Sequence, residues 1–219
     1  MSNRNIIKLF ESRSVDIDDR VKRDYASNGI VTLPCQISDY NDVISTYSVK
    51  GYEELNTEFS DYIKTAAEYA PPECPLVLNI IGDCLSAEEK IIITDTIQDT
   101  FAYELGAVEK EEKRHTKVFI FMIVGLILSG ILLYFTHTVA DEPRELIYVL
   151  FWFMGDTLCD YIFLTGYDLR HNRRMAGRLA SIKVAFSDKY KEPNYTESDV
   201  DRLYSEIEKD VRESRQEEE

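Results

Sequence analysis

Two apolar stretches constrain this 219-residue chain more than any other feature. Residues 118–134 read VFIFMIVGLILSGILLY without a charge, and a second apolar stretch covers residues 146–167. A helix that crosses the hydrocarbon core of a bilayer needs about 20 mostly apolar residues. Both stretches meet this requirement and a short polar segment separates them. The sequence therefore predicts an antiparallel two-helix transmembrane hairpin over residues 113–169, with spans at 118–136 and 146–167.

Basic residues indicate how the hairpin is oriented. The connecting segment, residues 136–145, contains one Arg and three acidic residues, whereas cations flank the other ends of both spans. Lys and Arg concentrate on the cytoplasmic side of membrane proteins. We therefore expect a multi-pass protein of the cell inner (plasma) membrane with both termini in the cytosol. The predicted juxtamembrane anchors are Lys113, Arg114, Lys117, Arg170, Arg173, Arg174 and Arg178.

Charge is distributed unevenly along the chain. The formal net charge is −15, and residues 1–110 carry ten basic against twenty acidic residues. Residues 168–192 reverse this balance with seven basic against three acidic residues, and residues 193–219 carry four against ten. Nucleic acid is an unsuitable partner for so acidic a chain, because affinity for phosphate backbones comes from clustered Lys and Arg. The bilayer is the partner that the sequence predicts.

Motifs for catalysis or cofactor binding are missing from the sequence. It has no phosphate-binding loop, nucleotide fingerprint, nucleophile elbow or H-E-x-x-H. The VDIDD segment at residues 15–19 can supply oxygen ligands to a divalent cation, but acidic pairs of this kind are usually solvated turns. We therefore expect no enzyme, cofactor or metal site. The cysteines form no C-x-x-C pair and are predicted to be reduced thiols; they are Cys35, Cys74, Cys84 and Cys159.

The first 112 residues are predicted to form a cytosolic α+β domain with a small sheet. Residues 30–37 and 43–49 are short and β-branched, which predicts a strand pair, with Pro34 at an edge or a bulge. Apolar residues then recur at helical spacing from Tyr52 to Ala70, and residues 76–81 (LVLNII) have the pattern of a buried central strand.

Helix signals flank the hairpin. The S-A-E-E sequence at Ser86 is a capping box, and no Pro follows before Val118, so this helix is expected to run into the first span. After the second span, residues 170–192 are predicted as a cytosolic helix and then a strand at 181–186 that returns to the N-terminal sheet. The alternative is a helix on the membrane surface. Residues 193–219 are predicted as an acidic C-terminal helix that docks through a narrow apolar stripe.

Asp156 and Asp160 are the strongest functional candidates. They lie one helical turn apart inside the second span, with Trp152 one turn earlier. Carboxylates in a bilayer cost about 2.5–3.5 kcal/mol each and are read as functional by default. They can line a cation path in an assembly of hairpins. The alternative is a span shifted outward, with Asp160 paired with Lys117 or Arg114.

Small residues in the first span predict close helix packing. Gly125 and Ser129 form a small-x-x-x-small pair, and Gly130 adjoins it. Such residues allow the backbone of another helix to approach closely. The approaching helix is either the second span of the same chain or a second copy.

A family resemblance rests on the segments PPECPLVLNIIG, SAEEK, WFMGDTLCDY and LRHNRR. In these segments and their order, residues 71–186 are similar to a group of uncharacterised bacterial two-span membrane proteins. This resemblance implies no activity. The layout is also similar to that of bacterial immune effectors, which pair a cytosolic sensing domain with a short transmembrane hairpin.

Three functional hypotheses follow. The first is an effector of bacterial defence or signalling, in which a cytosolic domain senses a protein or a small-molecule ligand and the hairpins form a homo-oligomer that perturbs the membrane or conducts ions. The second is a membrane-anchored adaptor that recruits a cytosolic partner. The third is an enzyme whose site has no recognisable motif. The intramembrane aspartates favour the first hypothesis.

Overall fold

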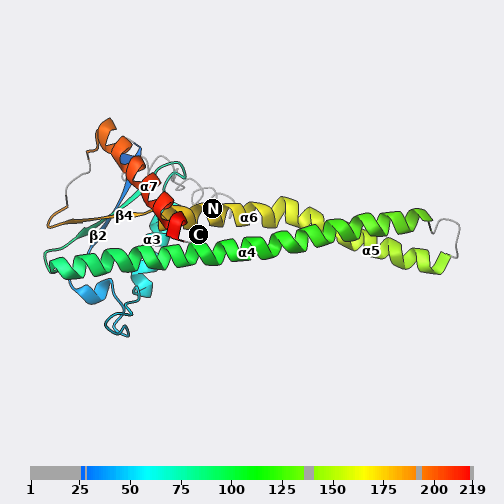
Figure 1. The fold of residues 1–219 in the computed structure, drawn as a ribbon, viewed down its shortest axis with the longest axis horizontal. Coiled ribbons are helices and arrows are strands. Elements are labelled where there is room, and N and C mark those ends of the chain that lie inside the picture. The colour runs from blue at the N-terminus through cyan, green and yellow to red at the C-terminus, as the bar shows by residue number, and fades with distance from the viewer. Residues whose placement is uncertain (1–25, 28, 136–140, 191–193, 218–219) are drawn as a thin grey trace, which may run out of the picture. The chain divides into compact units, whose positions relative to one another are not determined.

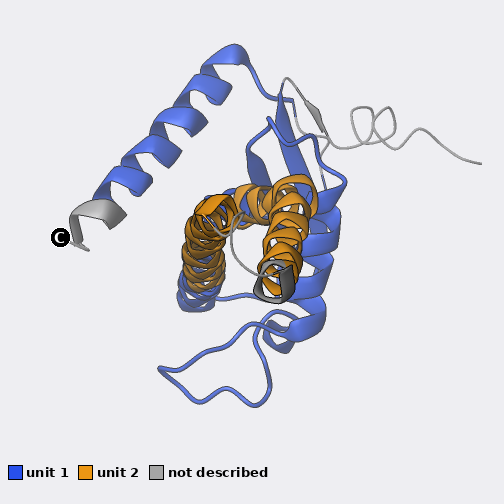
Figure 2. Ribbon diagram, turned by 90° about the vertical axis from the view of Figure 1, so that its right-hand side faces the viewer, with its two compact units in different colours: residues 1–102, 177–219 blue, residues 103–176 orange. Residues whose placement is uncertain are grey.

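The computed structural model describes residues 26–27, 29–135, 141–190 and 194–217 (Figure 1). They form two compact units, which Figure 2 distinguishes: unit 1 is residues 1–102 and 177–219, and unit 2 is residues 103–176. The elements are β1 (Ala26–Ser27), β2 (Ile30–Gln36), η1 (Tyr40–Asp42), α3 (Thr57–Glu68), β3 (Leu76–Ile81), α4 (Ala87–Phe135), α5 (Asp141–Asp160), η3 (Tyr161–Thr165), α6 (Gly166–Ala180), β4 (Lys183–Ser187) and α7 (Glu197–Glu217).

Unit 1 is a mixed α/β unit built on a small sheet with the strand order β1-β2-β3-β4. The two-residue β1 is antiparallel to β2, and the other neighbouring pairs are parallel. β3 is the buried central strand that its continuous apolar sequence predicts. β4 pairs with β3 in the register Leu78↔Val184, so the predicted strand after the second apolar helix does return to the N-terminal sheet.

Side chains alternate between two covered faces of this sheet. Leu76, Leu78 and Ile80 share one face and are at most 1% exposed. Ile30 and Val77 lie on the other face, where Leu203 of α7 completes a buried cluster. The apolar stripe of α7 therefore docks on its own chain. Thr32 and Tyr195 reinforce this contact through a 3.1 Å hydrogen bond between their hydroxyls.

Pro34 lies in β2 at a position where an N–H group is not needed for pairing with β3. The N–H groups of Val31 and Ile37 donate to the backbone carbonyls of Pro75 and Ile81, on the β3 side. Alternate residues of a strand point their N–H groups the same way, so the nitrogen of Pro34 faces the opposite edge. Among the described residues, β1 pairs with Ile30 and Val31 of β2 and not with Pro34.

The predicted strand at residues 43–49 is wrong. This segment forms a loop with two isolated bridges, Ile44↔Leu55 and Val49↔Tyr52. Val43 and Ile44 are nevertheless buried, so they anchor the loop in the core and mimic the alternation of a strand. α3 also begins later than predicted, because Asn56 caps it by accepting the N–H of Glu58 at 3.0 Å.

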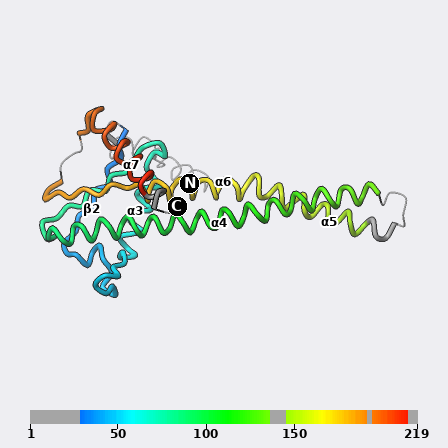
Figure 3. The backbone as a smooth tube through the Cα atoms, in the orientation of Figure 1, coloured from blue at the N-terminus to red at the C-terminus, as the bar shows by residue number. Residues whose placement is uncertain are grey.

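α4 is a continuous helix of 49 residues (Figure 3). Its capping box forms as predicted: the Ser86 hydroxyl accepts the N–H of Glu89 at 3.3 Å, and the Glu89 carboxylate accepts the N–H of Ser86 at 2.8 Å. In unit 1, Ile97 and Phe101 of this helix are fully buried. The helix then continues without interruption into unit 2, as the absence of Pro predicts.

Unit 2 consists of the rest of α4 together with α5, η3 and most of α6. Two helices, Ala87–Phe135 and Glu145–Ala180, are long and apolar enough to cross a membrane. Only 6% of the apolar window of each is buried. These helices therefore differ from the core helices of a soluble protein, whose apolar residues are covered.

Candidate functional site

Asp156 and Asp160 lie on the exposed side of α5. Trp152, one turn earlier, is 68% exposed, and Phe153 beside it is 61% exposed. Residues four apart share a helix face. The two carboxylates thus form an acidic line within an exposed apolar surface, and we call Trp152, Asp156 and Asp160 the acidic face.

Nothing in the described part of the chain neutralises the acidic face. Neither Asp156 nor Asp160 forms a hydrogen bond or ion pair through its side chain with another described residue. Lys117 and Arg114, the alternative partners of Asp160, are exposed and form no such pair with it. As far as the described residues go, the carboxylates are therefore left to an external partner or to water.

The small residues of α4 lie against α5. A Cβ added to Gly125 would approach the sulfur and the terminal carbon of Met154 to 2.8 Å, and one added to Gly130 would meet Phe151 at 3.5 Å. Ser129 is buried, and its hydroxyl donates to the carbonyl of Leu126 at 3.0 Å. These positions serve the contact between α4 and α5 of one chain, which is the intramolecular alternative.

The predicted basic anchors divide into two groups. Arg178 differs from the others because it lies in unit 1, half-buried, where it donates to the carbonyls of Pro71 at 2.9 Å and Cys74 at 3.0 Å. Burial lowers the pKa of this guanidinium. Arg178 therefore holds the turn after α3 and does not act as an exposed anchor. The exposed cations are Lys113, Arg114, Lys117, Arg170, Arg173 and Arg174.

A π-helical segment, η3, follows Asp160 directly. The wide turn ends at Gly166, whose N–H meets the carbonyls of Leu164 and Tyr161. A Cβ at Gly166 would lie 3.0 Å from the Tyr161 carbonyl, so a larger residue would crowd this turn. π segments inside α-helices occur frequently at functional sites.

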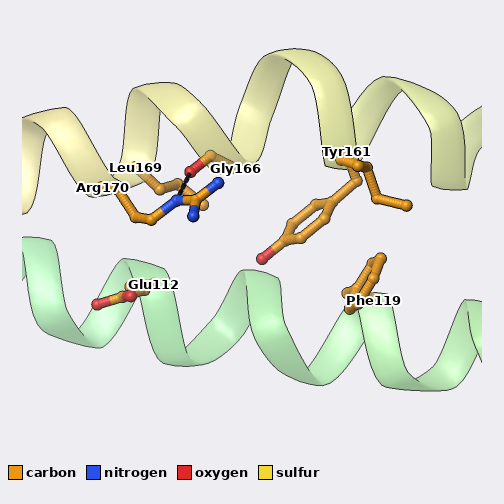
Figure 4. A pocket seen from close by; sticks show the side chains of 7 residues that line it. Glu112, Phe119, Tyr161, Gly166, Leu169 and Arg170 are labelled. Atoms are coloured by element: carbon orange, nitrogen blue, oxygen red, sulfur yellow. Dashed lines mark hydrogen bonds between the residues drawn. The ribbon is translucent and has the colours of Figure 1, made fainter.

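A pocket of about 280 Å³ lies beside this segment in unit 2 (Figure 4). Its lining is apolar at one end, where the rings of Phe119 and Tyr161 stack with centroids 4.4 Å apart. Glu112 and Arg170 form the charged end. The lining residues are Glu112, Phe119, Tyr161, Ile162, Gly166, Leu169 and Arg170. We call this the interhelical pocket.

Ion pairs shape the charged end of the interhelical pocket. Arg173 lies 3.1 Å from Glu112 and 3.2 Å from Glu109, so one guanidinium bridges two carboxylates of α4. The Nε of Arg170 donates to the carbonyl of Gly166 at 2.9 Å, which fixes its guanidinium beside the pocket. In Figure 4 the hydroxyl of Tyr161 is turned toward this charged end.

Sequence reasoning did not identify η3 or the interhelical pocket. Tyr161–Thr165 contains no Pro or Gly, so it gives no sign of a wide turn. The pocket also depends on the register between α4 and the η3–α6 segment, which no local pattern specifies. The sequence does offer three signals near this site: an aromatic residue (Tyr161), a glycine (Gly166) and the change from apolar to charged residues between Tyr167 and Arg170.

Cysteines and metal ligands add no further site among the described residues. The four cysteines are free thiols, and burial, together with Asp42, raises the pKa of Cys35. The described residues contain no group of three or more His, Cys, Asp or Glu side chains placed to hold a metal ion. The VDIDD segment at residues 15–19 lies outside the described residues.

Comparison of the chain with protein-family models, curated proteins and solved structures found no match. The geometry of the acidic face and of the interhelical pocket is therefore the basis for a functional proposal.

Proposed function

We propose that this chain is an inner-membrane effector of bacterial defence or signalling with two spans and cytosolic termini. α4 and α5 form the transmembrane hairpin, unit 1 senses a cytosolic ligand or protein, and the hairpins associate through the acidic face. The associated carboxylates line a route for cations. One observation carries the proposal: Asp156 and Asp160 are exposed on an apolar surface and have no partner among the described residues.

The cost of isolated carboxylates drives the proposed association. At about 2.5–3.5 kcal/mol for each residue near the bilayer centre, the acidic face opposes dispersal of single hairpins in lipid. Gathering several hairpins around water removes this cost and produces a ring of carboxylates, which favours cations. The small residues of α4 are already used by α5, which leaves the acidic face for contacts between copies.

A membrane-potential assay on cells that express the chain tests this proposal. We expect wild type to depolarise the membrane after activation and the double variant D156N/D160N to insert and assemble without depolarising it. Asp168→Asn is the matched control, because Asp168 is exposed on α6 beyond the second apolar stretch. Full depolarisation by D156N/D160N would refute the conducting role.

Cysteine labelling tests the orientation. In a Cys159→Ser background, a cysteine at Thr138 should react with a membrane-impermeant reagent added to intact spheroplasts. Native Cys84, which is exposed in unit 1, should react only after the membrane is opened. Labelling with the opposite pattern would reverse the proposed topology.

One observation favours the adaptor as a second candidate. The loop between η1 and α3 exposes Tyr47 by 94% and Tyr52 by 83%. The loop is ordered by hydrogen bonds, such as the N–H of Ser45 to the carbonyl of Glu54 at 2.8 Å. Exposed aromatic residues on a fixed loop suit protein recognition. If the chain is an adaptor, Y47S/Y52S would abolish recruitment of the cytosolic partner, whereas D156N/D160N would not.

A further inference from the structure

The interhelical pocket combines the two properties of a site for an amphiphile. Phe119 and Tyr161 form an apolar end, whereas Glu112 and Arg170 form a charged end about two helical turns away along α4. The same change occurs in the sequence, where charged residues before Val118 give way to the first apolar stretch. In the proposed membrane placement, the apolar end faces hydrocarbon and the charged end faces headgroups.

The headgroup end presents the Arg170 guanidinium, which can bind an anion. Glu112 pairs with Arg173 at 3.1 Å, and Arg173 also pairs with Glu109 at 3.2 Å. Among the described residues, no carboxylate forms an ion pair with Arg170. The Nε of Arg170 is held by the Gly166 carbonyl, which leaves its two terminal nitrogens for a ligand. Guanidinium groups bind phosphate through charge-assisted hydrogen bonds. The hydroxyl of Tyr161 provides a second donor at the same end.

We propose that the interhelical pocket binds an anionic phospholipid, with the phosphate on Arg170 and the Tyr161 hydroxyl, and an acyl chain along Phe119 and Ile162. This inference shares the membrane placement of the proposed function but does not depend on ion conduction.

Titration of the purified full-length chain in maltoside detergent tests the proposal. The probes are dioctanoyl phosphatidylglycerol, dioctanoyl phosphatidylcholine and inorganic phosphate, and binding is followed by native mass spectrometry and by thermal stabilisation. We expect saturable binding of phosphatidylglycerol, weak binding of phosphatidylcholine and no effect of phosphate. Equal binding of both lipids, or displacement of phosphatidylglycerol by inorganic phosphate, would overturn the proposed lipid specificity.

Two arginines on α6 provide a matched pair of variants. Arg170 lines the pocket, whereas Arg174 is an exposed arginine one turn later that does not. R170Q should weaken phosphatidylglycerol binding roughly ten-fold, as expected for the loss of one charge-assisted contact. R174Q should leave it nearly unchanged. Equal losses in both variants would mean that general electrostatic attraction, not the pocket, binds the lipid.

Further variants keep the test decisive if R170Q disturbs folding. Tyr161→Phe removes one donor and retains the stacked ring, so it should weaken binding less than R170Q does at unchanged helix content. D156N/D160N should bind phosphatidylglycerol normally. Failure of lipid binding with intact depolarisation would refute this inference alone, and the reverse pattern would refute the conducting role alone.

Discussion

The two parts of α4 have opposite surroundings although they belong to one uninterrupted helix. In unit 1, Ile93, Ile97 and Phe101 are fully buried, whereas in unit 2 Phe121 is 70% exposed and Leu128 is 60% exposed. Both parts are helical and rich in apolar residues, so neither property distinguishes them. The comparison shows that one helix satisfies two environments: a protein core for its first turns and, in the proposed placement, lipid for its last turns.

The largest effect that sharpens this comparison is expected at Ile182, which is 1% exposed beside β4. Ile182→Asp buries an unpaired charge in unit 1 and should lower the free energy of unfolding by about 4–5 kcal/mol. Limited proteolysis of the membrane-inserted protein measures this loss. Ala185→Asp in β4 is the control, because Ala185 is exposed. Equal protease resistance of both variants would mean that the sheet does not need this residue.

Identical substitutions in α4 test the comparison directly. Phe101→Ala leaves a cavity in the core of unit 1 and should cost about 3–5 kcal/mol in denaturant unfolding of that unit. Phe121→Ala removes an exposed ring and should change the free energy of unfolding in detergent by less than about 0.5 kcal/mol. Similar costs at both positions would contradict the division of α4 into a core part and an exposed part.

In the proposed membrane placement, the acidic face should oppose insertion of a single hairpin. Asp156→Leu replaces a carboxylate by an apolar side chain and should favour insertion by about 3 kcal/mol. A glycosylation-based insertion assay measures this gain. Asp168→Leu serves as the control and should have a smaller effect, since it lies beyond the apolar stretch. An unchanged inserted fraction in Asp156→Leu would indicate that Asp156 sits at the aqueous interface.

The smallest expected effect concerns the first turn of α4 and depends on pH. The hydrogen bonds from Ser86 hold the pKa of Glu89 below its ordinary value of 4.5. A carboxylate with a lowered pKa contributes stability that is present above the unfolded pKa and is lost as the pH falls through the folded pKa. Glu89→Gln should therefore destabilise unit 1 at pH 7, and this difference should shrink as the pH falls below 4.5. A pH-independent difference in melting temperature would exclude this capping contribution.

Sequence patterns predicted the elements whose signals are local. The capping box at Ser86, the uninterrupted α4 and the apolar β3 each depend on neighbouring residues, and each is present. The loop at residues 43–49 was misread because Val43 and Ile44 are buried from a loop, which imitates a strand. Alternating apolar and polar residues indicate that one side of a segment is buried. They do not by themselves show that the segment is a strand paired in a sheet.

Part of the candidate site was also accessible from sequence. Asp156 and Asp160 are conspicuous because charges are rare in apolar stretches. The different role of Arg178 was not accessible, because its acceptors are backbone carbonyls more than a hundred residues earlier. Contacts between residues so far apart in the chain can be identified only from the folded structure. The interhelical pocket was missed for the same reason.

The position of β4 in the sheet gives biosynthesis a fixed order. β3 ends at Ile81 and its neighbour β4 begins at Lys183, so the ribosome must produce both long apolar helices before the sheet can be completed. Until then, β3 has an unpaired edge of the kind that invites aggregation or proteolysis. A chain whose synthesis stops before Lys183 therefore carries an unfinished sheet. The sheet of unit 1 therefore gains its last strand only after both apolar helices have been synthesised.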